Sequence, residues 1–597
     1  MCGIVAIFAY GRRAPAVDTE EVVRIRDAMA PRGPDAQGAW LSDDRRVGFG
    51  HRRLAIIDVG PSGLQPMTLA GAATRIVFNG EIYNYRDLRR ELEARGRVFR
   101  TNSDTEVILH GYEEYGRDVV RRLRGMFAFA IWDERNRGLF LARDPLGIKP
   151  LYYADDGRTI RVASQVKALV CGAVDAAIDP TACVSFYLLG YVAEPFTIQR
   201  RVRALPAGST MWVTGAGAET PRPYFSVRDA LLAAEDAPRL STDREAVGAA
   251  IRASVAAHMV SDVPVGVFLS AGLDSSVVAA MAQEHAGAPL KTVTLGFEEF
   301  RGTPDDEAPL AESIAAAMKS DHRTVWVRGH DFLAEREQLF KAMDQPTIDG
   351  VNTYFVSKAA AAAGVKVALS GLGGDELFGG YPSFSQVPRI VAALGSLRAA
   401  PWLGRAVRVV SSAVIGNRLS PKYAGLLEYG TSFEDAYLLR RALFMPWELP
   451  AVLDPEIIRT GWRELRPLLS LRETVAGIGR HHSRVAALEM TWYMRNQLLR
   501  DTDWASMAHS VEVRTPLVDV ELLGELAPML VSARPPTKID MALASAIGSM
   551  DPVLKRAKTG FSTPVQQWLN EESPDSTVPA RGLRTWSKVV FSRHTGL

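Results

Sequence analysis

The sequence contains few cysteines, no long apolar run and no large excess of charge of either sign. Cys2, Cys171 and Cys183 are too few and too widely spaced for a disulfide framework or a zinc site. Sparse cysteine is typical of proteins of the reducing cytoplasm, so we expect a cytoplasmic location. Because no run of about 18 apolar residues is present, we expect no membrane-spanning helix and no membrane partner.

The formal net charge of +2 predicts no strong attraction to nucleic acid, so we expect no nucleic-acid partner. The hydrophobic share of 47% and the charged share of 23% are typical of globular proteins. Since 597 residues exceed what a single hydrophobic core organises, we expect two or more domains.

The segment Ser270–Ser276 follows the apolar run Val265–Leu269 and precedes the helix-compatible run Val277–Met281. This order predicts a buried parallel strand, a tight turn and a helix N-terminus, an arrangement whose free N–H groups bind phosphate. Gly272 would let the backbone approach a ligand closely. Asp274 would repel phosphate unless a cation lay between them, which indicates Mg²⁺. The alternative is an ordinary Gly-Ser turn capped by Asp274.

A second unit of the same kind joins the apolar run Val365–Leu369 to the Gly-rich segment Ser370–Tyr381, and Lys291–Phe297 is a further predicted strand. The alternation of strands and helices predicts a parallel sheet with ligands at the carboxyl ends of its strands. Asp375 would then lie on the same edge as Asp274, and we expect the two to form a Mg²⁺ pair.

At the other end of the sequence, Cys2 directly follows Met1. If Met1 is removed, Cys2 carries both a thiol and a free α-amine, whose pKa of about 8 lets it take the thiol proton. The alternative is a buried, inert cysteine. Four further segments bear on this choice, and they are Arg32–Asp35, Gly50–Leu54, Phe78–Asn84 and Thr101–Glu106.

Together with Cys2, these segments resemble the glutaminase domain of class II, N-terminal-nucleophile glutamine amidotransferases. The resemblance implies that Cys2 is the nucleophile and that Asn79 and Gly80 form the oxyanion hole, which stabilises the tetrahedral intermediate. It also implies that Arg53 holds the α-carboxylate of glutamine. The two carboxylates that the resemblance assigns to the substrate ammonium are Glu81 and Asp104.

The Ser270–Ser276 turn resembles the phosphate loop of ATP pyrophosphatases, and no Gly-Lys-Ser/Thr follows it as in a Walker A loop. The segments Ser506–Leu517 and Lys555–Phe561 resemble signatures of glutamine-hydrolysing asparagine synthetases, and Lys558 matches the lysine that neutralises phosphate charge. This resemblance covers residues 1–565. The positions that it implies for ATP are Leu269, Ser270, Ala271, Gly272, Leu273, Asp274, Ser275, Ser276, Leu295, Gly296, Ser370, Gly371, Gly373 and Asp375.

The implied fold is an α+β N-terminal-nucleophile sandwich followed by an α/β parallel-sheet ATP-pyrophosphatase domain with a helical C-terminal part. We expect a glutaminase domain over residues 1–225, a polar linker over 226–243, a synthetase domain over 244–570 and a C-terminal tail over 571–597. The implied reaction is glutamine-dependent amidation of a carboxylate through an acyl-adenylate, with ATP and Mg²⁺. The implied partners are glutamine, ATP and aspartate as acceptor, in a homodimer.

Three positions depart from the family pattern and leave the acceptor open. Ala271 replaces a usual glycine, and Asp501 replaces a usual basic residue. Leu372 stands where many relatives have a carboxylate that could take a proton from attacking ammonia. The alternatives are an amidotransferase for another carboxylic acid, such as a cell-envelope or secondary-metabolite acid, and a glutamine- or nucleotide-binding protein that has lost synthesis.

Overall fold

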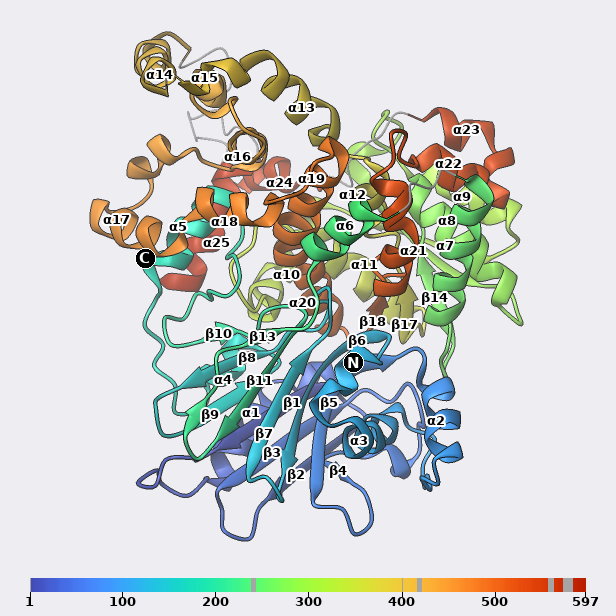
Figure 1. Cartoon of the computed structure of the whole chain (residues 1–597). Helices are drawn as coiled ribbons and strands as arrows, with labels where there is room; N and C mark the ends of the chain where they lie inside the picture. Colours follow the sequence, from blue (N-terminus) through green and yellow to red (C-terminus); the bar gives the residue numbers. More distant parts are fainter. Residues whose placement is uncertain are drawn as a thin grey trace.

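The computed structural model describes residues 2–237, 243–399, 401–415, 421–556, 563–572 and 583–596. Two antiparallel sheets form the N-terminal part, and the C-terminal part contains a parallel sheet that lies next to the N-terminal part (Figure 1). The expected fold class is confirmed, with an antiparallel sandwich followed by a parallel α/β unit and a helical remainder.

The first sheet has the strand order β10-β8-β9-β1-β3-β2, and the second has the order β12-β11-β7-β6-β5-β4, with β13 beside β11. Their strands are β1 (Gly3–Phe8), β2 (Ala36–Leu41), β3 (Val47–Arg53), β4 (Met67–Thr68), β5 (Thr74–Ile82), β6 (Gly125–Asp133), β7 (Gly138–Arg143), β8 (Tyr152–Asp155), β9 (Ile160–Ala163), β10 (Arg203–Ala204), β11 (Ser209–Thr214), β12 (Gly217–Ala218) and β13 (Arg222–Pro223).

The two sheets pack face to face because each presents apolar side chains at alternate positions. Ile4 and Phe8 of β1 lie in one cluster with Val77 of β5 and Trp132 of β6. The rings of Phe8 and Trp132 are 4.9 Å apart. This packing brings the start of β1 next to β5, on which the predicted oxyanion residues lie.

Helices cover the outer faces of the sandwich. On the first sheet, α1 contacts β1 and β3, and on the second sheet α3 contacts β5. Ser103 caps the N-terminus of α3 by accepting a hydrogen bond from the Thr105 N–H group, as its sequence predicts. The helices of this part are α1 (Thr19–Asp27), α2 (Tyr85–Ala94), α3 (Asp104–Tyr115), α4 (Val166–Val170) and α5 (Pro180–Leu189).

The third sheet is parallel throughout and has the order β16-β15-β14-β17-β18. Its strands are β14 (Val265–Phe268), β15 (Lys291–Phe297), β16 (Asp321–Val327), β17 (Val367–Leu369) and β18 (Glu512–Arg514). The predicted strands before both Gly-rich turns are therefore confirmed, and β14 and β17 are direct neighbours. That neighbourhood places the two turns side by side.

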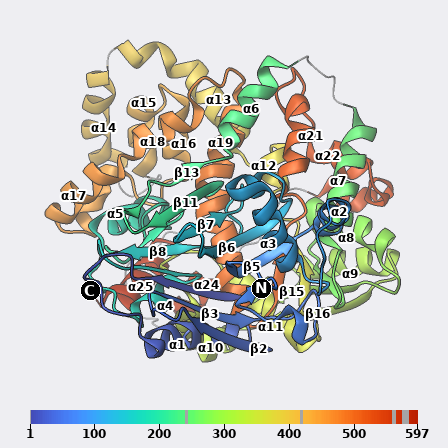
Figure 2. The same ribbon diagram turned by 60° about the horizontal axis from the view of Figure 1, so that its bottom comes forward.

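The helices of the C-terminal part surround this sheet and extend beyond it (Figures 1 and 2). They are α6 (Val227–Asp236), α7 (Arg244–His258), α8 (Leu273–His285), α9 (Ala308–Ala317), α10 (Gly329–Ala342), α11 (Val351–Ala362), α12 (Gly374–Phe378), α13 (Ser383–Leu394), α14 (Pro401–Ile415), α15 (Leu426–Tyr429), α16 (Phe433–Arg441), α17 (Pro455–Leu465), α18 (Pro467–Val475), α19 (His481–Leu488), α20 (Arg500–Met507), α21 (Val520–Leu530), α22 (Lys538–Leu543), α23 (Asp551–Lys555), α24 (Val565–Glu572) and α25 (Arg584–Thr595).

Two of the expected connecting segments contain helices in the structure. The predicted polar linker, residues 226–243, begins with helix α6, whose Val227 and Leu231 are buried against neighbouring helices. The predicted tail, residues 571–597, contains α25, which buries Trp586 against the rings of Phe332 and Phe340. In both segments a few apolar residues at helical spacing are buried and hold a helix in place, although most of the surrounding residues are polar.

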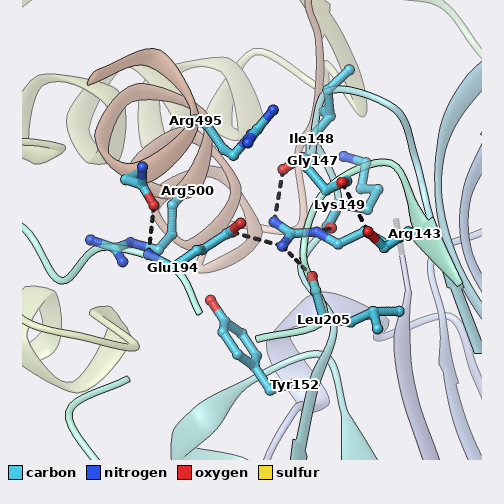
Figure 3. A network of polar contacts seen from close by, with 12 residues as sticks. Arg143, Gly147, Ile148, Lys149, Tyr152, Glu194, Leu205, Arg495 and Arg500 are labelled. Carbon is cyan, nitrogen blue, oxygen red and sulfur yellow. Dashed lines mark hydrogen bonds and ion pairs between the residues drawn. The ribbon is translucent and has the colours of Figure 1, made fainter. Parts of the chain in front are cut away.

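The two parts of the chain share a buried polar interface. Arg143 of β7 donates hydrogen bonds to Glu194 and to the carbonyl groups of Gly147, Lys149 and Leu205 (Figure 3). From the C-terminal part, a π-helical segment, Glu489–Leu499, and the helix after it reach this network. Their contacts are hydrogen bonds from Arg495 to the Leu146 carbonyl, from the Glu194 N–H group to Asn496, and from Arg500 to the Val192 carbonyl.

Candidate active sites

Cys2 lies at the entrance to β1, and its side chain is buried. Its backbone N–H group donates a 2.8 Å hydrogen bond to the Oδ1 atom of Asn79, although the two residues are 77 positions apart. Burial raises the pKa of the Cys2 thiol above its ordinary value. The thiol is therefore protonated at neutral pH and needs a base when it acts as a nucleophile.

Asn79 and Gly80 lie on β5 opposite the start of β1. The Nδ2 atom of Asn79 is buried and makes no hydrogen bond within the described part of the chain, so it is a donor available to a ligand. Gly80 has φ of 154°, and a Cβ atom there would lie 2.0 Å from the Met126 carbonyl oxygen. Only glycine fits this close approach of β5 to β6.

The three charged residues assigned to glutamine occupy the same region. The positive charge of Arg53 acts on the Cys2 thiol, and the guanidinium of Arg53 donates to the carbonyl groups of Gly60 and Asp58. Burial raises the pKa of Asp104 to about 6, although Asp104 accepts a hydrogen bond of 3.1 Å from the Ile82 N–H group. Burial also raises the pKa of Glu81, and the nearby charge of Asp104 contributes to this shift.

Sequence reasoning missed that Glu81 faces a cation of the C-terminal part. The guanidinium of Arg514 lies 3.5 Å from the carboxylate of Glu81 and 2.7 Å from that of Glu512. All three side chains are buried. Arg514 belongs to the segment that matched the synthetase signature, but the sequence gave no sign that it would meet the glutaminase residues.

A second missed contact joins the nucleophile to the C-terminal part. The Nε atom of Arg32 donates a 3.1 Å hydrogen bond to the Cys2 carbonyl oxygen. The two terminal nitrogens of Arg32 donate to both carboxylate oxygens of Asp503, at 2.6 and 3.1 Å. Both side chains are almost fully buried. Asp503 lies on α20, two residues after Asp501.

A cavity of about 410 Å³ opens at the carboxyl ends of β14 and β17. Its walls include twelve of the fourteen positions predicted for ATP. The predicted positions outside the walls are Ser276, whose hydroxyl donates to the Gly272 carbonyl at 2.8 Å, and Gly296, which packs against Trp326. Ser276 and Gly296 therefore lie next to the lining residues Ser275 and Leu295 without lining the cavity themselves. The cavity-lining positions are Leu269, Ser270, Ala271, Gly272, Leu273, Asp274, Ser275, Leu295, Ser370, Gly371, Gly373 and Asp375.

The two turns meet backbone to backbone. A Cβ atom on Gly371 would lie 2.5 Å from the Ser275 nitrogen, and one on Gly374 would lie 2.4 Å from the Asp274 carboxylate. Ser270 and Ser275 are joined by a 2.8 Å hydrogen bond between their hydroxyl groups. Because α8 begins at Leu273, the helix dipole and the free N–H groups of its first turn face the cavity.

Asp274 and Asp375 converge on one point, where the Nζ atom of Lys538 contacts both carboxylates. Sequence reasoning missed Lys538, because nothing in the sequence around it resembles a phosphate-binding signature. Two carboxylates held at one point supply the hard oxygen donors that Mg²⁺ prefers, so the donor chemistry fits this ion, although Lys538 lies between them here and the described residues contain no group of three metal-ligating side chains. Lys558, the lysine predicted from the sequence, lies outside the described residues.

The wall of the cavity opposite these turns is acidic. Burial raises the pKa of Asp501 to about 7, and Asp501 accepts hydrogen bonds from Thr347 and Trp504. Asp349 also lines the cavity, and burial raises its pKa. Neither carboxylate forms an ion pair with any residue in the described ranges.

Glu376 and Leu372 line the same cavity. Burial raises the pKa of Glu376 to about 8. One of its carboxylate oxygens accepts a 2.9 Å hydrogen bond from the Tyr381 hydroxyl, whereas the other has no hydrogen-bond partner in the described part of the chain. Leu372 supplies an apolar surface in the cavity wall. The cavity therefore keeps a carboxyl group near the turn, four residues further along the chain.

Comparisons with known proteins match both parts of the chain. A family described as glutamine amidotransferase domain matches residues 1–225, and one described as asparagine synthase matches residues 246–578. Asparagine synthetase (glutamine-hydrolyzing) 1 of Bacillus subtilis is 34% identical over 585 residues, which cover 96% of this chain and 88% of the relative. A putative asparagine synthetase (glutamine-hydrolyzing) of Mycobacterium tuberculosis is 35% identical over 599 residues, with 95% and 88% covered. Amidase chry2 of Gibberella zeae is 32% identical over 408 residues, with 64% and 60% covered.

Proposed function

Because this chain belongs to the glutamine-hydrolysing asparagine synthetase family, and is thus an ATP-using carbon–nitrogen ligase that takes nitrogen from glutamine, we propose that it converts aspartate to asparagine. The full reaction consumes ATP, aspartate, glutamine and water, and it yields AMP, diphosphate, asparagine and glutamate. The observation that carries the proposal is the cavity between the two Gly-rich turns and the acidic wall, which offers a phosphate end and an amine-binding end.

The glutaminase half of the reaction uses Cys2. After removal of Met1, the α-amine of Cys2 takes the proton from the thiol. A base is needed for this step because the raised pKa of the thiol keeps it protonated at neutral pH. The thiolate attacks the side-chain carbonyl of glutamine, and the unused amide donor of Asn79 supports the resulting oxyanion together with the Gly80 N–H group. Collapse of the intermediate releases ammonia and leaves a thioester, which water then hydrolyses to glutamate.

The synthetase half uses the cavity. The acceptor carboxylate attacks the α-phosphorus of ATP, and diphosphate leaves toward the N–H groups at the start of α8. Lys538 neutralises charge at this end. Asp274 and Asp375 would hold Mg²⁺, which when bound neutralises charge on the diphosphate. Ammonia then attacks the acyl carbon, loses a proton, and AMP leaves.

Strand β18 connects the two sites. Alternate residues of a strand face opposite sides, and here Glu512 and Arg514 face the glutaminase residue Glu81 while Val513 lines the ATP cavity. The two sites therefore share one strand as a common wall. We propose that ammonia passes along this buried region, where exclusion of bulk water keeps it unprotonated.

The acidic wall supports an acceptor that carries an amine. Asp349, Asp501 and Glu376 lie around the cavity and form no ion pair within the described ranges, although the charge of Arg500 acts on Asp501, and buried carboxylates are stable there only when a ligand or a proton neutralises them. The α-ammonium of aspartate meets this need. Glu376 lines the same cavity as Leu372, and its ionised form, which its raised pKa of about 8 makes the minor form at neutral pH, takes the proton from attacking ammonia in place of an acid at position 372.

A second candidate is amidation of a different carboxylic acid by the same chemistry. The apolar side chain of Leu372 in the cavity wall favours it, because a less polar acceptor would pack against leucine. One of the similar proteins, amidase chry2 of Gibberella zeae, is not named as an asparagine synthetase.

The deciding experiment measures ATP-dependent diphosphate release with a panel of carboxylic acids, including aspartate and the matched acid without its amine, succinate. We expect release with aspartate and formation of asparagine, and none with succinate. Cys2→Ala is the control: it should abolish glutamine hydrolysis but keep synthesis from added ammonium salt. Robust glutamine hydrolysis without asparagine would reject aspartate, and an unchanged glutaminase rate in Cys2→Ala would reject the nucleophile. Light scattering on the same sample would test the proposed homodimer.

A further inference from the structure

Helix α14, Pro401–Ile415, presents an apolar face to solvent. The exposed fractions of its side chains are 71% for Trp402, 61% for Val409 and 71% for Val410, and Leu403 and Ala406 are also exposed. Residues 402, 406, 409 and 410 are separated by four, three and one positions, so they lie on one face of a helix. The helix lies at the periphery of the molecule in both views (Figures 1 and 2).

The inward face of α14 is the polar one. Gly404 is buried and packs closely against the Glu428 backbone, since a Cβ atom at this position would lie only 2.7 Å from it. Arg408 points the same way, pairs with Glu428 and packs over the ring of Trp447 at 4.7 Å. The helix therefore directs its ion pair toward the protein and its apolar residues toward solvent, the reverse of an ordinary surface helix.

The sequence around α14 is positively charged. From Leu377 to Leu427 it contains no aspartate or glutamate. Arg405, on the edge of the apolar face, exposes 76% of its side chain although its Nε atom lies 3.8 Å from the Glu428 carboxylate, and Arg389 of the preceding helix is also exposed. The basic residues of this stretch are Arg389, Arg398, Arg405, Arg408, Arg418 and Lys422. Tyr423, in the turn that packs beside α14, adds an exposed aromatic ring.

We propose that α14 binds the surface of an anionic lipid bilayer, with its apolar face in the headgroup region. A helix with tryptophan and valine on one face and arginine beside them has the composition of an interfacial helix. Fifteen residues are too few to span a bilayer, and no helix of the described residues is long and apolar enough to do so, so α14 lies on the surface. This departs from the expectation that the protein has no membrane partner.

Charge decides between a bilayer and a second copy of the chain. A symmetric contact through α14 would place two positively charged, acid-free stretches against each other, which is unfavourable. An anionic bilayer instead supplies the opposite charge and an apolar layer for Trp402. The proposal does not depend on the identity of the acceptor, because α14 contributes no residue to the ATP cavity.

The test is co-sedimentation of the full chain with vesicles. Wild-type protein should bind vesicles of phosphatidylcholine with roughly one third phosphatidylglycerol, bind neutral phosphatidylcholine vesicles at least about tenfold more weakly, and lose binding as salt is raised. The triple variant Trp402→Ser, Val409→Ser, Val410→Ser should lose binding, and Arg405→Glu should weaken it roughly tenfold.

The matched control is Val98→Ser, which removes a valine that is 77% exposed in the N-terminal part and should leave vesicle binding unchanged. Glutamine hydrolysis at the wild-type rate by every variant would show that each is folded. Binding that survives in the triple variant, equal binding to neutral vesicles, or no binding by the wild type would overturn the proposal. A triple variant that changes the oligomeric mass in light scattering would overturn it too, in favour of a contact between copies or with another protein.

Discussion

Replacing Asp503 with leucine should destabilise the protein and disturb the glutaminase site. The Arg32 and Asp503 side chains expose only 1% and 5% of their surface and are joined by two hydrogen bonds, of 2.6 and 3.1 Å. Removing one member of such a pair leaves an uncompensated buried charge, which costs about 3–5 kcal/mol. With an unfolding entropy of about 2.1 cal/mol/K per residue, cooperative unfolding of the whole chain would shift Tm down by roughly 2–4 °C.

The double variant Arg32→Met, Asp503→Leu separates the charge from the packing. Because it removes both buried charges, we expect it to recover most of the loss, so that the two single effects are not additive. Asp87→Leu is the matched control, since Asp87 and Arg90 form a pair that is largely exposed to solvent and should leave Tm unchanged.

The assays are thermal unfolding followed by circular dichroism and the two partial activities. Arg32→Met also removes the hydrogen bond to the Cys2 carbonyl, so glutamine hydrolysis should fall more than synthesis from ammonium salt. Additive Tm shifts in the double variant, or a Tm of Asp503→Leu equal to that of the wild type, would refute the reasoning that this pair joins nucleophile and synthetase.

Two further predictions concern the cavity. Asp274→Asn or Asp375→Asn should slow ATP-dependent diphosphate release on the order of 100-fold, because each removes charge from the point where both carboxylates meet, whereas glutamine hydrolysis should persist; a normal rate of release would place the metal elsewhere. The pKa of Glu376 is raised to about 8 from 4.5, so the folded state holds a proton that the unfolded state has lost, and stability from this group falls as pH rises from 4.5 to 8. Glu376→Gln should therefore lose less Tm over this pH range than the wild type, and an identical decline in both proteins would contradict the assignment.

The local signals in the sequence were sufficient for the strands and turns. Val265–Leu269 and Val365–Leu369 are short apolar runs followed by glycine and serine, and the period of the pattern predicts strand and turn without reference to the rest of the chain. The placing of Asp274 and Asp375 on one edge of the sheet followed from the rule that ligands gather at the carboxyl ends of such strands, whereas the direct pairing of β14 with β17 was seen only in the structure. The adjacency of Cys2 and Asn79 is a tertiary contact, which the sequence indicated only through family resemblance.

Only the tertiary structure decided the contacts between distant residues. Nothing near Lys538 marks it as the cation between two aspartates, and nothing near Arg32 or Arg514 predicts that each crosses from one site to the other. Such pairs depend on how the domains pack. A single charged residue in a sequence could equally well be exposed to solvent, so its ion-pair partner cannot be predicted from the sequence. The direction of the apolar face of α14 was hidden for the same reason, because periodicity reveals that a helix has two faces but not which one the fold turns toward solvent.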